Sequence, residues 1–541
     1  MATVGESPAL FLRKATGLVK GWSKFDAFLY SFMSVNFVTL GLFFALSVLA
    51  FVPTGQVIPA ILISGVFVSF LVVTYAMLIS VMPRAGGDYV WQSRTLGGGL
   101  AFLLAVTGWW FILWYWAPIY ANILNVEFLQ PLAALFKWGG LSTFLASKNG
   151  LFVVCLFTVA LAGYLVSLGM EGYAKVQKVC FYLGIIGLGI LLLVMLFGSH
   201  SGFINAYNQE SRNLFGAPNA YRDTFRDAGA YQVVPNMGFS PFFGDSLLLI
   251  PFLCFWILWP NWGATLYGEV RGASDFKRVM SGMMYGLWVT IAIAIVFILL
   301  ASKFFGWQFF NAANLDYWDV VYGLGKAPIP VWPYPPLLVG MFFHNTLIAG
   351  FLVLLFGVWF LGWAGTLFLS STRVIFAAAF DRVLPEKVAD VSEKRHVPVW
   401  GLILMLVPAI VVSAMYAYTS KFATYILDAT LVIAITFFGT AIAAIILPWR
   451  KKQLYQDSAI SRYKILGIPA ISVCGFVTAL FLGFNLWEWF TNANYAVNNK
   501  TSLVFMGSMY VLAIVIYVIA WFVRRNQGID LKAVYTEIPV E

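Results

Sequence analysis

Residues 252–270 read FLCFWILWPNWGATLYGEV, an apolar helical stretch with a helix breaker in its middle. No charged side chain occurs before Glu269, so the stretch suits a lipid bilayer, where each buried charge costs several kcal/mol. Pro260 lacks an amide hydrogen and disfavours helix at Trp259, and the next residues, Asn261 and Gly263, tolerate unusual backbone angles. The stretch therefore predicts a membrane span that is broken over Trp259–Thr265.

The rest of the chain has the same character. It has 541 residues, of which 61% are hydrophobic and 10% charged, whereas soluble domains carry about 25% charged residues. The 33 Lys and Arg and 23 Asp and Glu are too few to coat several globular domains. This composition argues against a soluble enzyme, a disordered protein and a nucleic-acid binder. It predicts an all-α polytopic membrane protein.

Charge-free runs predict twelve transmembrane helices and divide the chain. The expected organisation is a cytoplasmic N-terminal segment (1–24), a first five-helix repeat with spans 1–5 (25–198), a long outer loop (199–245), a second repeat with spans 6–10 (246–449) that contains a further outer loop (304–335), spans 11 and 12 (450–523) and a cytoplasmic tail (524–541). The two long loops are expected either to pack as a lid or to be solvated.

The distribution of Lys and Arg predicts the orientation. With both termini inside, 24 of these residues lie on the inner side and nine on the outer side, which agrees with the positive-inside rule. We therefore expect a multi-pass protein of the cell (plasma) membrane with both termini in the cytoplasm. The four cysteines lie in apolar runs, so they are expected to be buried free thiols, and no metal-ligand spacing is present.

Span one, like span six, contains residues that interrupt a helix. If spans 1–5 and 6–10 are repeats, their odd length makes them inverted, and the two breaks then correspond and indicate a transport site. Exposed N–H groups at such breaks favour a carboxylate and exposed carbonyls a cation, so the site suits a zwitterion. An equal alternative is a proline-kinked packing helix. The predicted substrate-binding set is Ser34, Val35, Asn36, Thr39, Trp259, Asn261 and Gly263.

Several polar residues have two open interpretations. Asp428, placed inside span ten, is expected to couple protons or grip an amine, or else to be a water-accessible structural acid. His344, placed inside span eight, either titrates or is a packing residue, and Glu127 is expected at an outer interface. Four charges at inner helix ends are expected to form an inner gate or to be ordinary loop charges: Arg84, Glu269, Arg373 and Asp381.

Short motifs in several loops carry a resemblance. Pro83–Val90 (PRAGGDYV) is similar to the "PR-small-GG-D/E-Y" loop of the amino acid–polyamine–organocation (APC) permeases. Further matches follow in the family's order: Gly268–Val270, Ser371–Ala377, Asp381–Pro385, His396–Pro398 and Gly467–Pro469. The chain departs from the family pattern at Phe37-Val38-Thr39, in place of a Gly-x-Gly cluster, and at Trp259-Pro260-Asn261.

The resemblance implies a 5+5 inverted-repeat core of the LeuT/APC type plus two extra helices. It also implies uptake or exchange of amino acids or amines, with Ser370 and Ser371 near span-one carbonyls around Na⁺ in sodium-coupled members. Span five has no lysine, which weakens the proton mechanism of some relatives and leaves Na⁺ open. Beyond a coupling Na⁺ or H⁺, no cofactor is expected.

We therefore expect a secondary active transporter that moves neutral, apolar or aromatic α-amino acids by alternating access. Its expected partners are the small-molecule substrate and the lipid bilayer, and not nucleic acid. The alternatives are a polyamine or organic-cation exchanger, with Asp428 as the cation partner, and a non-transporting sensor or anchor. An enzyme is not expected, since no phosphate loop, metal cluster or nucleophile–base pair is visible.

Overall fold

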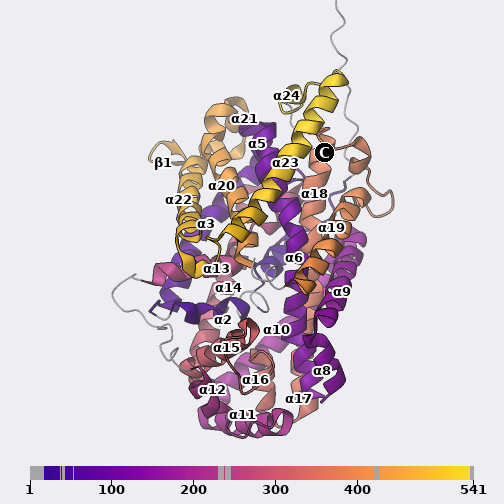
Figure 1. Cartoon of the computed structure of the whole chain (residues 1–541). Coiled ribbons are helices and arrows are strands. Elements are labelled where there is room, and N and C mark those ends of the chain that lie inside the picture. Colours follow the sequence, from indigo (N-terminus) through magenta and orange to yellow (C-terminus); the bar gives the residue numbers. More distant parts are fainter. Residues whose placement is uncertain are drawn as a thin grey trace, which may run out of the picture.

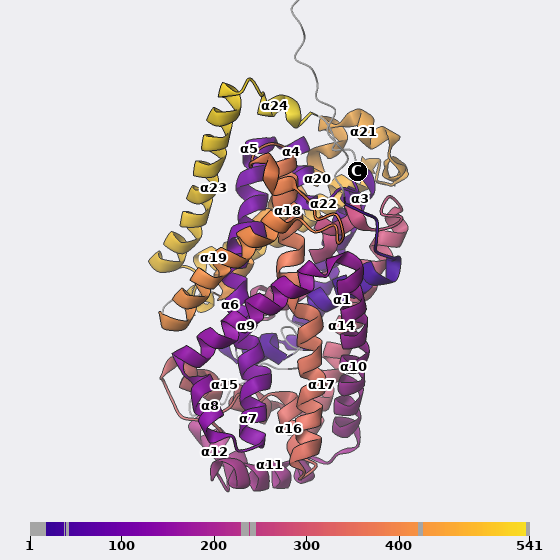
Figure 2. The ribbon, with the colours of Figure 1, turned by 90° about the vertical axis from the view of Figure 1, so that its right-hand side faces the viewer.

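The chain folds into a long bundle of helices, and the computed structural model describes residues 18–36, 38, 43–52, 54–228, 237, 245–419 and 426–536. Figures 1 and 2 show the bundle from two sides, with α21 and α24 at one end and α8, α11 and α12 at the other. Long helices with apolar side chains on their outer faces surround a core of buried aromatic residues. This arrangement fits a bilayer, because only fully hydrogen-bonded segments are stable in lipid.

Within the described residues, eleven helical segments are long and apolar enough to cross a membrane. They are α3 (Val57–Val81), the run α5 (Gly98–Ala101), η3 (Phe102–Phe111), α6 (Ile112–Leu124), η4 (Asn125–Leu129) and α7 (Gln130–Leu135), then α9 (Lys148–Ser167), α10 (Gly169–Phe197), α13 (Ser246–Ile257) with η6 (Trp262–Glu269), α14 (Phe276–Phe304), α17 (Thr346–Ala364) with α18 (Thr366–Phe380), α19 (Val399–Tyr418), α20 (Ile426–Arg450), α22 (Ala470–Thr491) and α23 (Lys500–Asn526).

Further elements make up the rest of the described chain. They are α1 (Lys24–Val35), α2 (Ala45–Ser47), η2 (Leu49–Phe51), α4 (Gly87–Thr95), α8 (Gly139–Ala146), α11 (His200–Phe215), α12 (Ala220–Asp227), α15 (Trp307–Tyr322), α16 (Pro335–Met341), η7 (Glu386–Ala389), α21 (Lys452–Asp457), η9 (Ala459–Arg462), η10 (Ala493–Tyr495), α24 (Leu531–Val534) and the antiparallel pair β1 (Lys464–Ile465) and β2 (Ile468–Pro469). All four cysteines are free and buried, as predicted.

The first predicted span includes residues 37 and 39–42, among them Thr39, which lie outside the described residues. The predicted count of twelve therefore stays a prediction. The part that is described is discontinuous, because α1 ends at Val35 and Asn36 adopts a left-handed conformation with φ of 47°. The Asn36 amide donates to the Phe32 carbonyl, which closes the helix end.

Span six is broken where the sequence predicts. The α-helix α13 ends at Ile257, and a 3₁₀-helix, η6, begins only at Trp262. Pro260 lies in the gap and supplies no amide for a helical hydrogen bond. The second half of the span therefore has its own first turn, and every residue of η6 is buried in the bundle interior.

The two segments that the sequence predicts to be long outer loops form helices at one end of the bundle, which are called the lid below; that they cover an outer mouth stays a prediction. Helices α11, α12, α15 and α16 gather at one end of the molecule in both views (Figures 1 and 2). Helix α15 lies against the broken first span, where the Trp318 indole donates to the Ser47 hydroxyl at 3.2 Å. The lid therefore contacts α2 directly.

Two sequence-based placements are wrong. His344 lies outside span eight, because the Asn345 side chain accepts hydrogen bonds from the Leu347 and Ile348 amides and starts α17 at Thr346. The His344 ring instead lies 3.1 Å from the Glu210 carboxylate in the lid. Glu127 is not interfacial but fully buried, because its helix continues through the π-helical segment η4 as far as Leu135.

Candidate functional site

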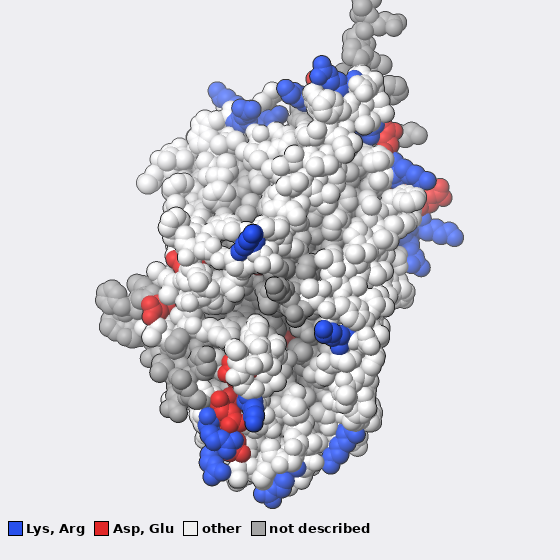
Figure 3. Space-filling model, viewed as in Figure 1, with Lys and Arg blue, Asp and Glu red and all other residues white. Residues whose placement is uncertain are grey.

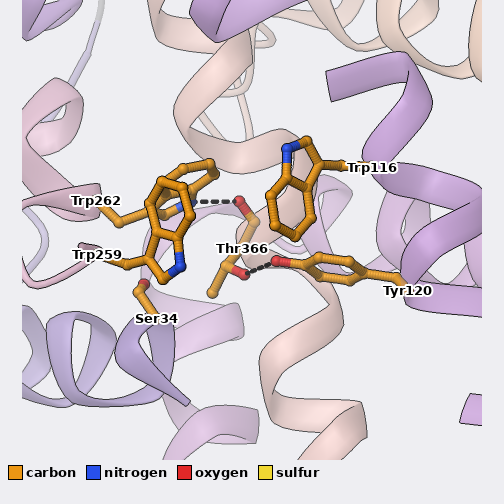
Figure 4. A pocket seen from close by; sticks show the side chains of 6 residues that line it. All are labelled: Ser34, Trp116, Tyr120, Trp259, Trp262 and Thr366. Atoms are coloured by element: carbon orange, nitrogen blue, oxygen red, sulfur yellow. Dashed lines mark hydrogen bonds between the residues drawn. The ribbon is translucent and has the colours of Figure 1, made fainter. Parts of the chain in front are cut away.

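A cavity of about 230 Å³, lined by buried residues, lies where the broken helices meet. Its lining comes from α1, α6, the break in span six, η6 and α18, and consists of Ser34, Trp116, Tyr120, Trp259, Trp262 and Thr366. Figure 4 shows Trp259 and Trp262 on one side and Trp116 and Tyr120 on the other, with Thr366 between them. None of these side chains is charged at neutral pH.

The aromatic rings form a rigid wall. Trp259 packs edge-on against Trp262 and against Trp116, with ring centroids 5.4 and 5.7 Å apart and both interplanar angles at 87°. Trp116 in turn stacks on Phe255 of α13, with centroids 5.4 Å apart. Such edge-to-face and stacked contacts hold each ring in one orientation. The cavity therefore presents fixed apolar surfaces to an occupant.

Thr366 supplies the polar centre of the cavity (Figure 4). Its carbonyl accepts a hydrogen bond from the Trp262 indole at 3.0 Å, and its hydroxyl donates to the Trp363 carbonyl at 2.7 Å. The Tyr120 hydroxyl is 3.2 Å from the Thr366 hydroxyl. Because the Thr366 proton is already committed to Trp363, Tyr120 is the donor in this contact.

Polar atoms around the cavity are buried without hydrogen-bond partners among the described residues. They are both side-chain polar atoms of Asn261, the hydroxyls of Ser31 and Thr265, and the Trp116 indole nitrogen. Buried polar groups are nearly always paired, so a cluster of unpaired ones calls for an explanation such as a ligand or water. Four of these five atoms belong to α1, η6 or the break itself.

The two broken spans touch each other at this point. A methyl group at Gly263 would lie 3.2 Å from the Tyr30 ring of α1, tighter than most real contacts, so a larger residue there would press on that ring. The Ser34 hydroxyl donates to the Tyr30 carbonyl at 2.7 Å within the last turn of α1. The first turn of η6 and the last turn of α1 thus face one another in the bundle core.

The predicted substrate set falls into three groups. Ser34 and Trp259 line the cavity, and Asn261 and Gly263 lie at the break beside it. Val35 is buried without lining it, and Asn36 accepts a hydrogen bond from the Trp359 indole at 2.9 Å. The sequence-based set omitted Tyr120, Trp262 and Thr366, and it singled out Trp116 only as one of several aromatic residues in span three.

Two buried ion pairs close one end of the bundle. Arg373 of α18 donates to both Glu269 carboxylate oxygens, at 2.7 and 3.0 Å. Arg94 of α4 makes a similar double contact with Asp381, one bond of which measures 2.8 Å. All four side chains are at most 1% exposed. Of the four charges expected to form an inner gate, three therefore belong to these pairs, while Arg84 does not.

The comparison with known families agrees with this architecture. The family model described as "Amino acid permease" matches residues 35–532, which is nearly the whole chain. The chain belongs to the amino acid permease family. This family is part of the APC superfamily and consists of transporters of amino acids or related organic cations, not of enzymes. No curated protein matches the permease significantly.

Ser370 of the permease joins both broken spans. Its hydroxyl lies 2.9 Å from the Tyr30 hydroxyl of α1 and donates to the Trp262 carbonyl at 3.0 Å. Ser371 only donates back to the Leu367 carbonyl of its own helix, at 3.3 Å. Of the two predicted ion-coupling serines, Ser370 is thus the one placed between the broken segments.

Asp428, the third ion-coupling candidate of the permease, lies away from the cavity. It occupies the first turn of α20 and is buried near Ser502 of α23, a helix at the edge of the bundle. One of its carboxylate oxygens makes no hydrogen bond within the described residues. The structure therefore does not bring Asp428 together with Trp259 or Asn261.

The loop that carries the PRAGGDY motif packs directly on the broken half of span six. The Gly86 amide donates to the Thr265 carbonyl at 2.8 Å, and a methyl group at Gly87 would lie 3.0 Å from the Ala264 carbonyl carbon. Asp88, which follows, is fully buried and accepts hydrogen bonds from Tyr75, Trp109 and Thr440. The motif thus packs against η6, a contact that the spacing of residues in the sequence did not predict.

Proposed function

We propose that the permease moves neutral α-amino acids with apolar or aromatic side chains by alternating access. The observation that carries the proposal is Asn261. Its amide is completely buried beside an aromatic cavity, at the break in span six, and its polar atoms make no hydrogen bond of normal geometry within the described residues, although the Tyr75 hydroxyl lies close by. An amide can donate to a carboxylate and accept from an ammonium group, so it suits a zwitterion.

The helix ends give such a substrate an orientation. In the proposed orientation the substrate carboxylate lies towards the first turn of η6 and its ammonium group towards the last turn of α1, because the start of a helix favours negative charge and its end favours positive charge. The side chain would then pack among Trp116, Trp259 and Trp262. No charged residue lines the cavity, so a second charge on the substrate would have no partner there.

The closed ends support an alternating cycle. The two ion pairs seal the end that holds α4 and the C-terminal part of α18, and the lid covers the other end. In the proposed cycle the lid and the ion-pair end open in turn, while the central site stays between the broken spans. We propose the plasma membrane as the location, with the ion-pair end and both termini in the cytoplasm, an orientation that the positive-inside rule supports.

The geometry of the cavity does not support the alternative function, a polyamine exchanger. That alternative needs a carboxylate to hold the second positive charge, and Asp428 does not line the cavity. We further propose Na⁺ or H⁺ as the coupling ion. Ser370 is the residue whose position between Tyr30 and the Trp262 carbonyl best supports the sodium alternative.

Uptake of radiolabelled amino acids into proteoliposomes tests the proposal. Asn261→Ala and Trp259→Ala should each lower uptake of neutral substrates at least about tenfold, since each removes a contact at the break; a tenfold loss corresponds to about 1.4 kcal/mol. The matched control is Asn485→Ala, a buried amide in α22 that donates to the Phe481 carbonyl, outside the cavity. Normal uptake by both site variants would reject the site.

A panel of amino acids in a thermal-shift assay identifies the substrate. A ligand that binds only the folded permease stabilises it by about 2.7 kcal/mol at one hundred times its Kd. Neutral apolar or aromatic amino acids should raise the unfolding temperature, and lysine, glutamate and polyamines should not. Stabilisation by polyamines alone would replace the proposed substrate class.

A further inference from the structure

A second, much more open cavity of about 850 Å³ lies at the end of the bundle that carries α21 and α24. Its polar lining comes from three separate segments: the end of α4, the junction of α20 with α21, and the C-terminal segment. The lining residues used below are Arg94, Arg450, Lys451, Lys452, Asp457 and Thr536. Figure 3 shows Lys and Arg side chains gathered at this end of the surface.

The residues that line this cavity carry an excess of positive charge. Arg94 is neutralised by Asp381, and Asp457 is the only acid in the lining. Arg450, Lys451 and Lys452 form no ion pair within the part of the chain that the structure describes. Partial burial and the nearby positive charges of Arg94 and Arg450 lower the pKa of Lys451. The cations thus repel one another in a space that is open to an anion.

The cavity lies at the level of the lipid headgroups. The spanning part of α20 ends at Arg450, so the three cations follow directly after a membrane helix. The preceding residue, Trp449, is 63% exposed, and tryptophan on an outer helix face is typical of the interface between hydrocarbon and headgroups. A basic pocket between helices at this depth suits the headgroup of an anionic lipid.

We propose that this cavity binds a phosphate-bearing anion, with an anionic lipid headgroup as the source that its position favours. Arg450 supplies a planar guanidinium that can donate two parallel hydrogen bonds to phosphate, and Lys451 and Lys452 supply mobile point charges. Residues from three separate chain segments would then contact the same anion. The proposal is independent of the transported substrate, because the cavity is separate from the one lined by Trp259.

Binding of an anion in this cavity would also affect the C-terminal segment. Tyr535 packs against Gly98, where any larger side chain would overlap its ring, and the Arg94 guanidinium lies 5.8 Å from the centre of that ring. The next residue, Thr536, lines the cavity. A bound phosphate would therefore hold the tail against the Arg94–Asp381 ion pair.

The test compares two charge-matched triple variants of the full-length permease. The first, R450Q/K451Q/K452Q, removes the cations of the cavity. The second, K394Q/K464Q/K532Q, removes three exposed lysines that do not line it. Native mass spectrometry and thermal unfolding are measured for delipidated protein with phosphatidylcholine, with phosphatidylglycerol, with a phosphatidylinositol phosphate, with soluble inositol hexakisphosphate and with inorganic phosphate.

The expected result is tight binding of an anionic lipid by the wild type and by the lysine control. The cavity variant should bind it more weakly, by about fivefold for each cation removed. Stabilisation by the soluble phosphates alone, lost only in the cavity variant, would support the phosphate site and replace the lipid as its source. Equal binding of every probe by the wild type and the cavity variant would overturn the proposal, as would equal losses in both triple variants.

Discussion

Glu269→Gln tests how the buried ion pair near the break controls the permease. The substitution keeps the shape of the side chain but removes its negative charge. Glu269 is 1% exposed and receives two hydrogen bonds from Arg373, which has no exposed surface. The guanidinium also donates to the neutral Thr372 hydroxyl at 3.0 Å. The variant therefore leaves a buried positive charge without its counter-charge.

The size of the effect follows from the burial of the pair. Removing one member of a buried, hydrogen-bonded ion pair costs about 3–5 kcal/mol. At 1.4 kcal/mol for each factor of ten, this is a change of roughly one hundred-fold to a few thousand-fold in an equilibrium constant. The pair links η6 to α18, and the Glu269 carbonyl also accepts from the Trp22 amide at 3.2 Å. The lost free energy therefore destabilises the conformations in which the ion-pair end of the bundle is closed.

A double-mutant cycle separates the pair from its surroundings. We expect Glu269→Gln and Arg373→Gln each to lower the unfolding temperature and the uptake rate. The double variant should recover part of both losses, because two neutral amides can bond to each other without a buried charge. Asp223→Asn is the control, since its partner Arg226 is 66% exposed and such surface pairs contribute at most about 1 kcal/mol.

Two outcomes would refute this reasoning. A Glu269→Gln permease that unfolds and transports like the wild type would show that the pair carries no net energy in the closed conformation. Losses in the double variant that equal the sum of the two single losses would show that the side chains act separately, whatever their distance.

Three further predictions concern single residues. Burial and the nearby charges of Asp227 and Asp319 raise the pKa of Asp316 in the lid from 3.8 to about 8, so the folded lid retains a proton that the unfolded chain releases. Its contribution to stability is complete below pH 3.8 and lost as the pH rises through 8; the unfolding temperature should fall between pH 5 and 9 in the wild type and less steeply in Asp316→Asn. Ser370→Ala should slow uptake at least about tenfold by loosening the contacts with Tyr30 and Trp262, and a sodium site there also requires that replacing Na⁺ by choline stops transport; undiminished uptake in choline would discard it. Asp428→Asn should leave uptake of neutral amino acids unchanged, because the residue lies outside the cavity, whereas a loss for every substrate would favour proton coupling through it.

The sequence predicts those parts of the fold that depend on local chemistry. Pro260 cannot donate a helical hydrogen bond wherever the helix packs, so the break in span six is visible from the sequence alone. His344 and Glu127 were misplaced for the opposite reason. A cap by Asn345 and a π-helical continuation through η4 set their helix ends, and both depend on hydrogen bonds that hydropathy does not register.

Only part of the candidate site could be predicted from the sequence, because some of its residues carry no local signal. Trp259 and Asn261 lie at the break and carry a local signal, whereas Thr366 and Tyr120 are ordinary residues of long helices. They join the cavity through helix packing, which brings together residues separated by 246 positions in the Tyr120–Thr366 contact. Arg373 and Glu269 are 104 positions apart, so only their charges, and not their pairing, could be named from the sequence.

The four cysteines, all free and buried, make the native chain a favourable background for site-specific labelling. A thiol reacts with maleimide reagents mainly as an accessible thiolate, so Cys155, Cys180, Cys254 and Cys474 should react slowly. A single cysteine introduced on the lid or beside the tail would then carry a fluorophore or spin label without prior removal of the native sulfur atoms. Distances between pairs of such labels would record the opening of each end in turn.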